Sequence, residues 1–196
     1  MKEEEERLLK LVEEAKKCVK CRLHKTRTNV VVGEGPLNSL IMLVGEAPGY
    51  WEDKQGKPFV GAAGKLLDKL LALAGLDRSK VYITNVVKCR PPGNREPKPD
   101  EIEACKGYLD EQISLIKPKI ICTLGNVASA YLLQKFGFQF QPMVRIHGKV
   151  FEVNQLKIIP LYHPATALYK PPIKKVLEED WRLVGAKIKN LSLKFF

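Results

Sequence analysis

Four cysteines are the residues whose type and spacing most clearly suggest chemistry. Cys18 and Cys21 form a C-x2-C pair, and Cys89 and Cys105 follow far downstream. Four thiolates suit either tetrahedral zinc or a 4Fe-4S cluster, but the second two lack the compact spacing of a zinc ribbon. Without further evidence, Cys89 and Cys105 could also be ordinary small buried residues. Cys122 lies within an apolar run and is best explained by core packing.

Distinctive polar and small residues follow short apolar runs at three other places. The segment 45–49 reads GEAPG, Asn85 lies near the end of the run 81–87, and Tyr162-His163-Pro164 follows the run 156–161. Ligands of open parallel sheets bind beyond the carboxyl ends of the strands. These segments are therefore expected to converge on one edge of a sheet.

The elements that must position these residues alternate along the chain. Apolar runs at 40–44, 81–87, 119–124 and 156–161 predict buried parallel strands. Helical periodicity is found at 3–17, 61–74, 99–116, 126–136 and about 173–193. This alternation predicts an α/β fold, a three-layer α/β/α sandwich with a central parallel four-stranded sheet, in a single domain spanning 1–196. We expect the segment 138–153 to form an excursion or hairpin around Gly148.

The composition sets limits on partners and location. The chain has 196 residues, with 33 Lys and Arg against 22 Asp and Glu, a formal charge of +11 that would attract a polyanion. A Lys/Glu-rich composition is also typical of thermophile proteins, so charge alone does not establish nucleic-acid binding. No run approaches the roughly 20 apolar residues of a membrane span. The N-terminus is charged where a secretory signal is apolar, so we expect a cytoplasmic protein. We also expect a monomer.

Taken together, the motifs resemble the family 4 uracil-DNA glycosylases, the thermostable iron-sulfur branch of that superfamily, over nearly the whole chain. The matching segments are Cys18 and Cys21, 45–49, 58–61, 84–89, the loop 90–95, Cys105, and His163-Pro164. The resemblance implies hydrolysis of the N-glycosidic bond of deoxyuridine in DNA, which releases uracil, leaves an abasic site and initiates base excision repair. It also implies one 4Fe-4S cluster on Cys18, Cys21, Cys89 and Cys105.

The resemblance also implies roles for residues of a uracil pocket. Phe59 would stack on the flipped-out base, and the Asn85 amide would pair with the O4 and N3–H edge of uracil. His163 would lie near O2 and stabilise the anionic leaving base, assisted by backbone N–H groups from Ala47 to Gly49.

The residue that activates water is left open by the sequence. The best-known branch of the superfamily has an aspartate that positions water at the place of Ala47, and an alanine side chain cannot position water. Glu46 and Glu52 are the candidate catalytic carboxylates, with Asp53 less favoured, and Glu46 is also expected at the uracil pocket.

The expected partner is single- or double-stranded DNA that contains uracil. Arg90, Asn94 and Arg95 would contact phosphates, and Leu168 would fill the gap left by the flipped nucleotide, although many relatives have a leucine at the position of Ala167. The C-terminal segment 193–196 is similar to the double aromatic of sliding-clamp peptides, but Ser192 stands where that motif has an aliphatic residue.

Three alternatives stay open at this stage. The chain could be a related glycosylase for another deaminated or mismatched base. It could be a noncatalytic iron-sulfur module that binds nucleic acid without releasing a base. It could also be a zinc-binding structural protein.

Overall fold

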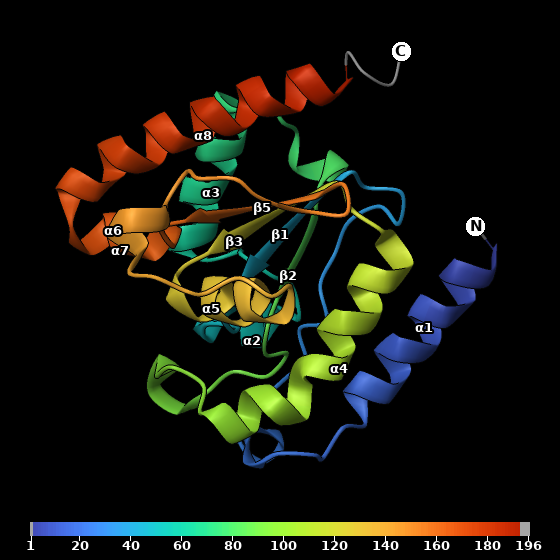
Figure 1. Cartoon of the computed structure of the whole chain (residues 1–196). Coiled ribbons are helices and arrows are strands. Elements are labelled where there is room, and N and C mark those ends of the chain that lie inside the picture. Colours follow the sequence, from blue (N-terminus) through green and yellow to red (C-terminus); the bar gives the residue numbers. More distant parts are fainter. Residues whose placement is uncertain (1, 193–196) are drawn as a thin grey trace.

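The structure, a computed structural model, describes residues 2–192 and contains one five-stranded sheet (Figure 1). The strand order is β2-β1-β3-β5-β4, and all neighbours are parallel except β4, which is antiparallel to β5. The strands are β1 (Ile41–Gly45), β2 (Tyr82–Asn85), β3 (Ile120–Leu124), β4 (Phe151–Val153) and β5 (Leu156–Leu161).

Helices connect the strands and cover the sheet. The α-helices are α1 (Lys2–Lys16), α2 (Tyr50–Gln55), α3 (Ala62–Leu73), α4 (Pro99–Ile116), α5 (Asn126–Lys135), α6 (Met143–Ile146), α7 (Pro164–Tyr169) and α8 (Pro171–Ser192). Three short 3-10 helices lie at Arg22–Lys25, Arg78–Lys80 and Pro92–Asn94. No helix in the described part of the chain is long and apolar enough to cross a membrane.

The predicted three-layer sandwich is confirmed, because alternate residues of each buried strand face different helices. Ile41 and Leu43 pack with α3 and α8, whereas Met42 and Val44 pack with α1, α4 and α5. In Figure 1 the α3–α8 layer lies above the sheet and the α4–α5 layer lies below it. Cys122 is fully buried in the first of these two cores, as predicted.

The predicted number of strands was wrong, because the sheet has five strands and not four. The additional strand β4 has only three residues, too few for a periodic signal, and it pairs with β5 at the edge of the sheet. The hairpin between them turns at Asn154 and Gln155, which both have positive φ, and not at Gly148. Gly148 instead follows α6, where a side chain would collide with Asp180.

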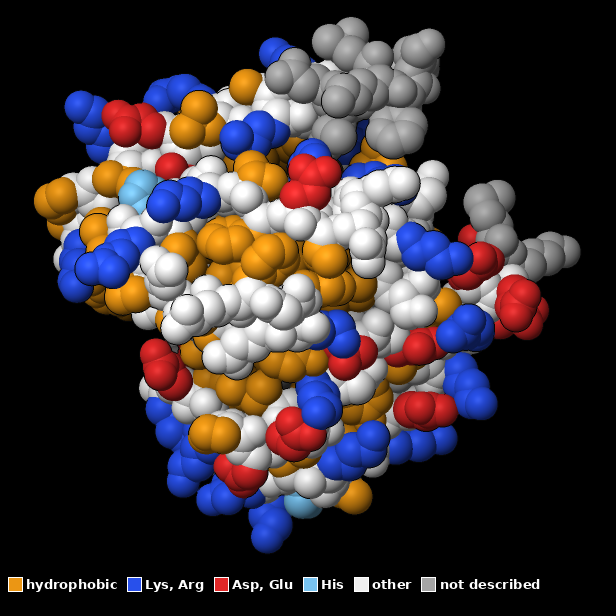
Figure 2. All heavy atoms as spheres, in the orientation of Figure 1, with side chains coloured by type: hydrophobic (Ala, Val, Ile, Leu, Met, Phe, Trp, Pro, Cys, Tyr) orange, Lys and Arg blue, Asp and Glu red, His pale blue; other side chains and the backbone are white. Residues whose placement is uncertain are grey.

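Figure 2 shows one face of the molecule, on which Lys and Arg side chains lie around much of the rim, including the lower edge over the loop between β2 and α4 and the loop after α1. The sliding-clamp expectation falls on residues 193–196, which lie outside the described residues.

A close backbone contact between α3 and α8 leads to a stability prediction. A methyl group added at Gly185 would lie 2.8 Å from Ala74 Cα and would also overlap the Ala74 carbonyl. We expect Gly185→Ala to lower the free energy of unfolding by about 1–3 kcal/mol, since backbone cannot yield as a side chain can. Gly107→Ala is the control, because Gly107 lies at an exposed position of α4 where a methyl group meets nothing within 4 Å. It should leave stability unchanged or raise it. Denaturant unfolding of both variants measures the difference; equal stabilities would contradict the packing argument.

Candidate active site

A cleft of about 780 Å³ opens at the carboxyl edge of the parallel strands. The segments that follow β1, β2 and β5 meet there, together with the start of α3. Of the residues proposed from sequence, those lining the cleft are Glu46, Ala47, Gly49, Glu52, Phe59, Asn85, Asn94, Arg95, His163 and Leu168. The expected convergence of distant segments on one edge is therefore confirmed.

Asn85 ends β2 and stands beside Gly45, its register partner on β1. The residue is 1% exposed, and its Oδ1 atom is buried without a hydrogen-bond partner among the described residues. A Cβ at Gly45 would overlap Asn85 Oδ1 and lie 2.7 Å from Phe59 Cζ. A buried acceptor without a partner costs free energy. The place of Asn85 Oδ1 in the cleft therefore indicates that this atom accepts a hydrogen bond from a bound ligand.

Phe59 is held in a strained backbone conformation next to Asn85. Its φ of 51° is unusual for a bulky residue, and a side chain at Gly64 would collide with its carbonyl group. Arg78 fixes the loop from behind, because its guanidinium donates to the carbonyl oxygens of Pro58 at 2.7 Å and Phe59 at 3.0 Å. The ring is thereby presented as a flat wall of the cleft, stacked on the His163 ring with centroids 5.6 Å apart.

His163 precedes the first turn of α7, and this position fixes its tautomer. Its Nδ1 accepts a hydrogen bond from the Ala165 backbone N–H at 3.1 Å, so the proton of the neutral ring belongs on Nε2. Burial lowers the pKa of His163 to about 4, although Glu52 opposes the shift. The ring is therefore neutral at pH 7 and offers Nε2–H as a donor.

The three nearby carboxylates have different environments. Glu52 Oε1 accepts backbone N–H groups from Val60 at 2.9 Å and Gly61 at 2.8 Å, which anchors the Phe59 loop. Asp53 is buried and accepts from the backbone of Thr28 at 2.8 Å, away from the cleft. Glu46 lines the cleft, and burial together with the charge of Glu96 raises its pKa to about 7.

A buried lysine supports the end of β2 from below. Lys88 Nζ donates to the Asn85 carbonyl at 2.7 Å, to Thr84 Oγ1 at 2.6 Å and to Gln112 Oε1 at 2.7 Å. Burial lowers the pKa of Lys88 to about 7. Three acceptors satisfy this ammonium group, so the backbone of Asn85 is tied to α4.

The residues proposed to contact DNA occupy different positions. Leu168 is exposed on the rim, whereas Ala167 is buried. Arg90 does not line the cleft; its guanidinium lies over the Tyr50 ring, and its Nε donates to Asn94 Oδ1 at 2.7 Å. Arg95 lines the cleft but makes a bidentate pair with buried Glu101 at 2.7 and 2.8 Å, so part of its role is to fix the loop to α4.

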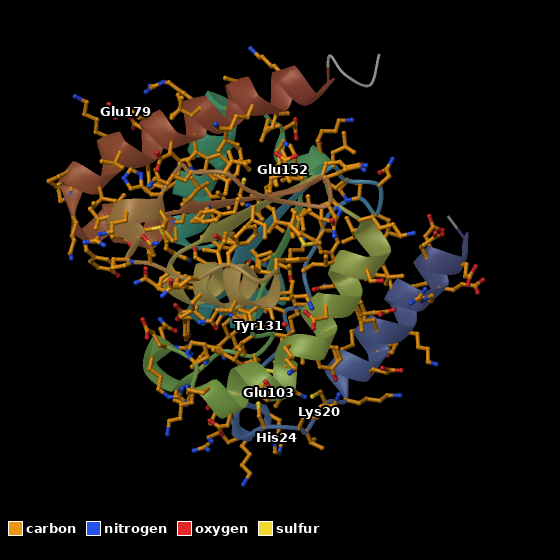
Figure 3. All side chains as sticks on the ribbon, viewed as in Figure 1. Lys20, His24, Glu103, Tyr131, Glu152 and Glu179 are labelled. Atoms are coloured by element: carbon orange, nitrogen blue, oxygen red, sulfur yellow. The ribbon has the colours of Figure 1, made fainter. Side chains whose placement is uncertain are left out.

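Cys18, Cys21, Cys89 and Cys105 line a second, smaller pocket between the loop after α1, the loop after β2, and α4. Figure 3 shows Lys20 and His24 of the first loop next to the early turns of α4. Arg27 Nη1 donates to Cys89 Sγ at 3.2 Å, and the Lys88 backbone N–H donates to Cys105 Sγ at 3.3 Å. Within residues 2–192, no group of three His, Cys, Asp or Glu side chains is placed to hold a single metal ion.

Comparison with known proteins identifies the family of the chain. The family model of the uracil DNA glycosylase superfamily matches residues 32–184. The chain belongs to this superfamily. Within it, the chain is 50% identical to a type-4 uracil-DNA glycosylase of Sulfurisphaera tokodaii, over 95% of this chain and 85% of the relative. It is 48% identical to the type-4 uracil-DNA glycosylase of Archaeoglobus fulgidus, over 89% of this chain and 90% of the relative. It is 46% identical to the type-4 uracil-DNA glycosylase of Thermotoga maritima, over 94% of this chain and 97% of the relative. The resemblance to the type-4 branch of the superfamily is thus confirmed.

Sequence reasoning assigned no role to three residues that shape the cleft, although Gly45 and Lys88 stand in segments that match the family. Gly45 ends an apolar run, and its closeness to Asn85 and Phe59 depends on strand pairing. Arg78 carried no signal, because its partners lie about 20 residues away. Lys88 did carry one, since it is a charged residue between the run 81–87 and Cys89.

The close approach at Gly45 leads to a prediction about the cleft. We expect Gly45→Ala to slow turnover of uracil-containing DNA by at least about 100-fold, because displacement of catalytic groups by about 1 Å has effects of that size. Single-turnover kinetics measure this loss, and a thermal melt shows whether the variant is folded. Gly107→Ala should keep full activity. Full activity of Gly45→Ala would show that the cleft tolerates the added methyl group.

Proposed function

We propose that this protein hydrolyses the N-glycosidic bond of deoxyuridine in DNA, releasing uracil and leaving an abasic site that enters base excision repair. The observation that carries the proposal is the unpartnered, buried Oδ1 of Asn85 in a cleft walled by Phe59. Oδ1 can accept from uracil N3–H while Nδ2 donates to O4. Cytosine presents the opposite pattern and would leave polar groups unpaired.

The remaining residues of the cleft suit bond cleavage. As the bond between C1' and N1 breaks, its electron pair passes to the uracil ring and positive charge develops on the sugar. The Nε2–H of neutral His163 can donate to uracil O2 and stabilise this anion. Water then adds to C1', and its proton passes to a carboxylate or to solvent.

Glu46 is the carboxylate that best fits a role at the sugar. It lines the cleft, and its side chain has no hydrogen bond or ion pair with another described residue. Glu52, by contrast, already accepts two backbone N–H groups. We therefore assign Glu46 to cation stabilisation and water activation, and Glu52 to positioning of the Phe59 loop.

We also propose that the four cysteines of the second pocket hold one 4Fe-4S cluster. Four thiols line one pocket, and two N–H donors point at two of the sulfurs, as is common around Fe-S clusters. When bound, the cluster would supply Fe–S bonds that join the loop after α1 to the loop after β2. Burial raises the pKa of the Cys89 thiol to about 11, so binding would displace protons.

The test of base recognition is the Asn85→Asp variant. We expect it to excise uracil more slowly and to release some cytosine, because a carboxyl group can accept from the cytosine amine; one bidentate contact contributes about 1–3 kcal/mol of discrimination. His163→Ala should slow cleavage while leaving the choice of base intact. Single-turnover cleavage of matched uracil, cytosine and hypoxanthine oligonucleotides measures both effects. A wild-type protein that releases no uracil would overturn the proposed function.

The raised pKa of Glu46 predicts the pH dependence. Its carboxylate form grows as pH rises through about 7, so the cleavage rate should climb between about pH 6 and 8 and then level off. His163 is neutral throughout this range and adds no limb. Glu46→Gln should remove the limb, and Glu96→Gln should shift it to lower pH by removing a neighbouring negative charge. An unchanged profile in Glu46→Gln would assign water activation elsewhere.

The cluster is tested by metal content with a matched pair of cysteine variants. We expect the purified protein to be yellow-brown and to hold about four irons per chain. Cys105→Ala should lose iron, visible absorption and thermal stability together. Cys122→Ala, a buried cysteine of the opposite core, should retain iron and colour. A colourless wild-type protein with stoichiometric zinc would contradict the assignment.

A further inference from the structure

The rim of the cleft carries exposed aromatic rings that uracil recognition does not use. Trp51 is 58% exposed and Tyr50 is 44% exposed at the start of α2, and both line the cleft. Trp51 Cδ1 lies 3.7 Å from the position of a Cβ at Gly61, so the indole stands next to the Phe59 loop. The free face of a large aromatic ring beside a nucleotide pocket is the feature by which proteins stack unpaired bases.

Trp51 packs against Tyr50, and two cations lie over the Tyr50 ring. Tyr50 meets Trp51 edge to face with centroids 5.1 Å apart. The Tyr50 ring itself has two cations over it, the Arg90 guanidinium at 5.1 Å and Lys54 Nζ at 5.8 Å. Tyr50 is therefore a support for the indole and the cations, which are placed to meet phosphates of a strand that crosses the rim.

We propose that Trp51 stacks on the base of a nucleotide adjacent to the flipped uracil, while Arg90 and Lys54 contact the phosphates of that segment. The inference rests on the proposed function, because uracil bound in the cleft sets the position of the DNA strand relative to Trp51. A neighbouring base is free to stack on protein only when it is not stacked within a duplex. Trp51 therefore favours uracil in single-stranded DNA over uracil within a duplex.

Intrinsic fluorescence can test this directly, because the chain has two tryptophans and Trp181 is fully buried. A change in emission on adding uracil-free oligothymidylate therefore reports on Trp51. The matched probe is an oligomer of the same length built of abasic sugar-phosphates, which keeps the charge and lacks the bases. We expect quenching by oligothymidylate and little by the abasic oligomer.

Variants measure the contribution of stacking. Trp51→Ala should bind oligothymidylate at least about fivefold more weakly, as expected for loss of one stacked base, whereas its affinity for the abasic oligomer should not change. Trp51→Phe should restore most of the loss, and thermal melts should show both variants folded, since the side chain is exposed. Excision from single-stranded DNA should fall in Trp51→Ala more than excision from duplex DNA.

The outcomes separate this inference from the proposed function. Equal oligothymidylate binding by Trp51→Ala and wild type, or equal quenching by both oligomers, would overturn the stacking role even if uracil is excised normally. Base-dependent quenching in a protein that excises no uracil would support the stacking surface and reject the function.

Discussion

The absence of a side chain at Gly45 is the constraint on which the rest of the cleft depends. β1 and β2 are hydrogen-bonded neighbours, so Gly45 and Asn85 lie side by side in register. With only hydrogen at Gly45, both the Asn85 amide and the Phe59 ring occupy the space above the end of β1. A buried hydrogen-bond acceptor and a flat aromatic wall are thereby brought together by ordinary parallel pairing.

The rigidity of this arrangement comes from polar groups that hold the Phe59 loop and the end of β2 in place. The Phe59 loop has a positive φ at Phe59 itself. Glu52 accepts hydrogen bonds from its backbone N–H groups, and Arg78 donates to its carbonyl oxygens. Beneath Asn85, Lys88 ties the strand end to Thr84 and Gln112. A recognition amide discriminates between bases only if it cannot rotate or shift to suit the wrong one. On the proposed function, the buried polar contacts around the cleft would therefore contribute to specificity by holding Asn85 and Phe59 in place.

The cysteine pocket is connected to the same strand end. Cys89 follows Lys88 directly, and the Lys88 backbone N–H points at Cys105 Sγ. A cluster on the four cysteines would fix the loop that begins there and carries Arg90, Asn94 and Arg95. Arg95 and Glu101 fasten the other end of this loop to α4. With the cluster bound, the loop would be held at both ends, and its cations would have fixed positions.

Local patterns determined the architecture of this protein. Buried parallel strands must be apolar on both faces, so four of the five strands and the long helices were visible as runs and periods, and α4 was predicted with its observed bounds. Turn-like segments at strand ends also marked Asn85 and His163, because the carboxyl ends of parallel strands meet at one edge. The family resemblance added the role of Phe59 and the expectation that the four cysteines hold one 4Fe-4S cluster.

Only the tertiary structure decided which partners and surroundings each of these residues has. The three-residue strand β4 forms because the edge of β5 offers unpaired backbone groups, which no local pattern records. Glu46 and Glu52 were both candidate catalytic carboxylates in the sequence, and hydrogen bonds from Val60 and Gly61 to Glu52 distinguish them. Arg90 and Arg95 are likewise distinguished by Tyr50 and Glu101. In each case the deciding partner belongs to another turn or element, and its distance is set by packing and not by the order of residues along the chain.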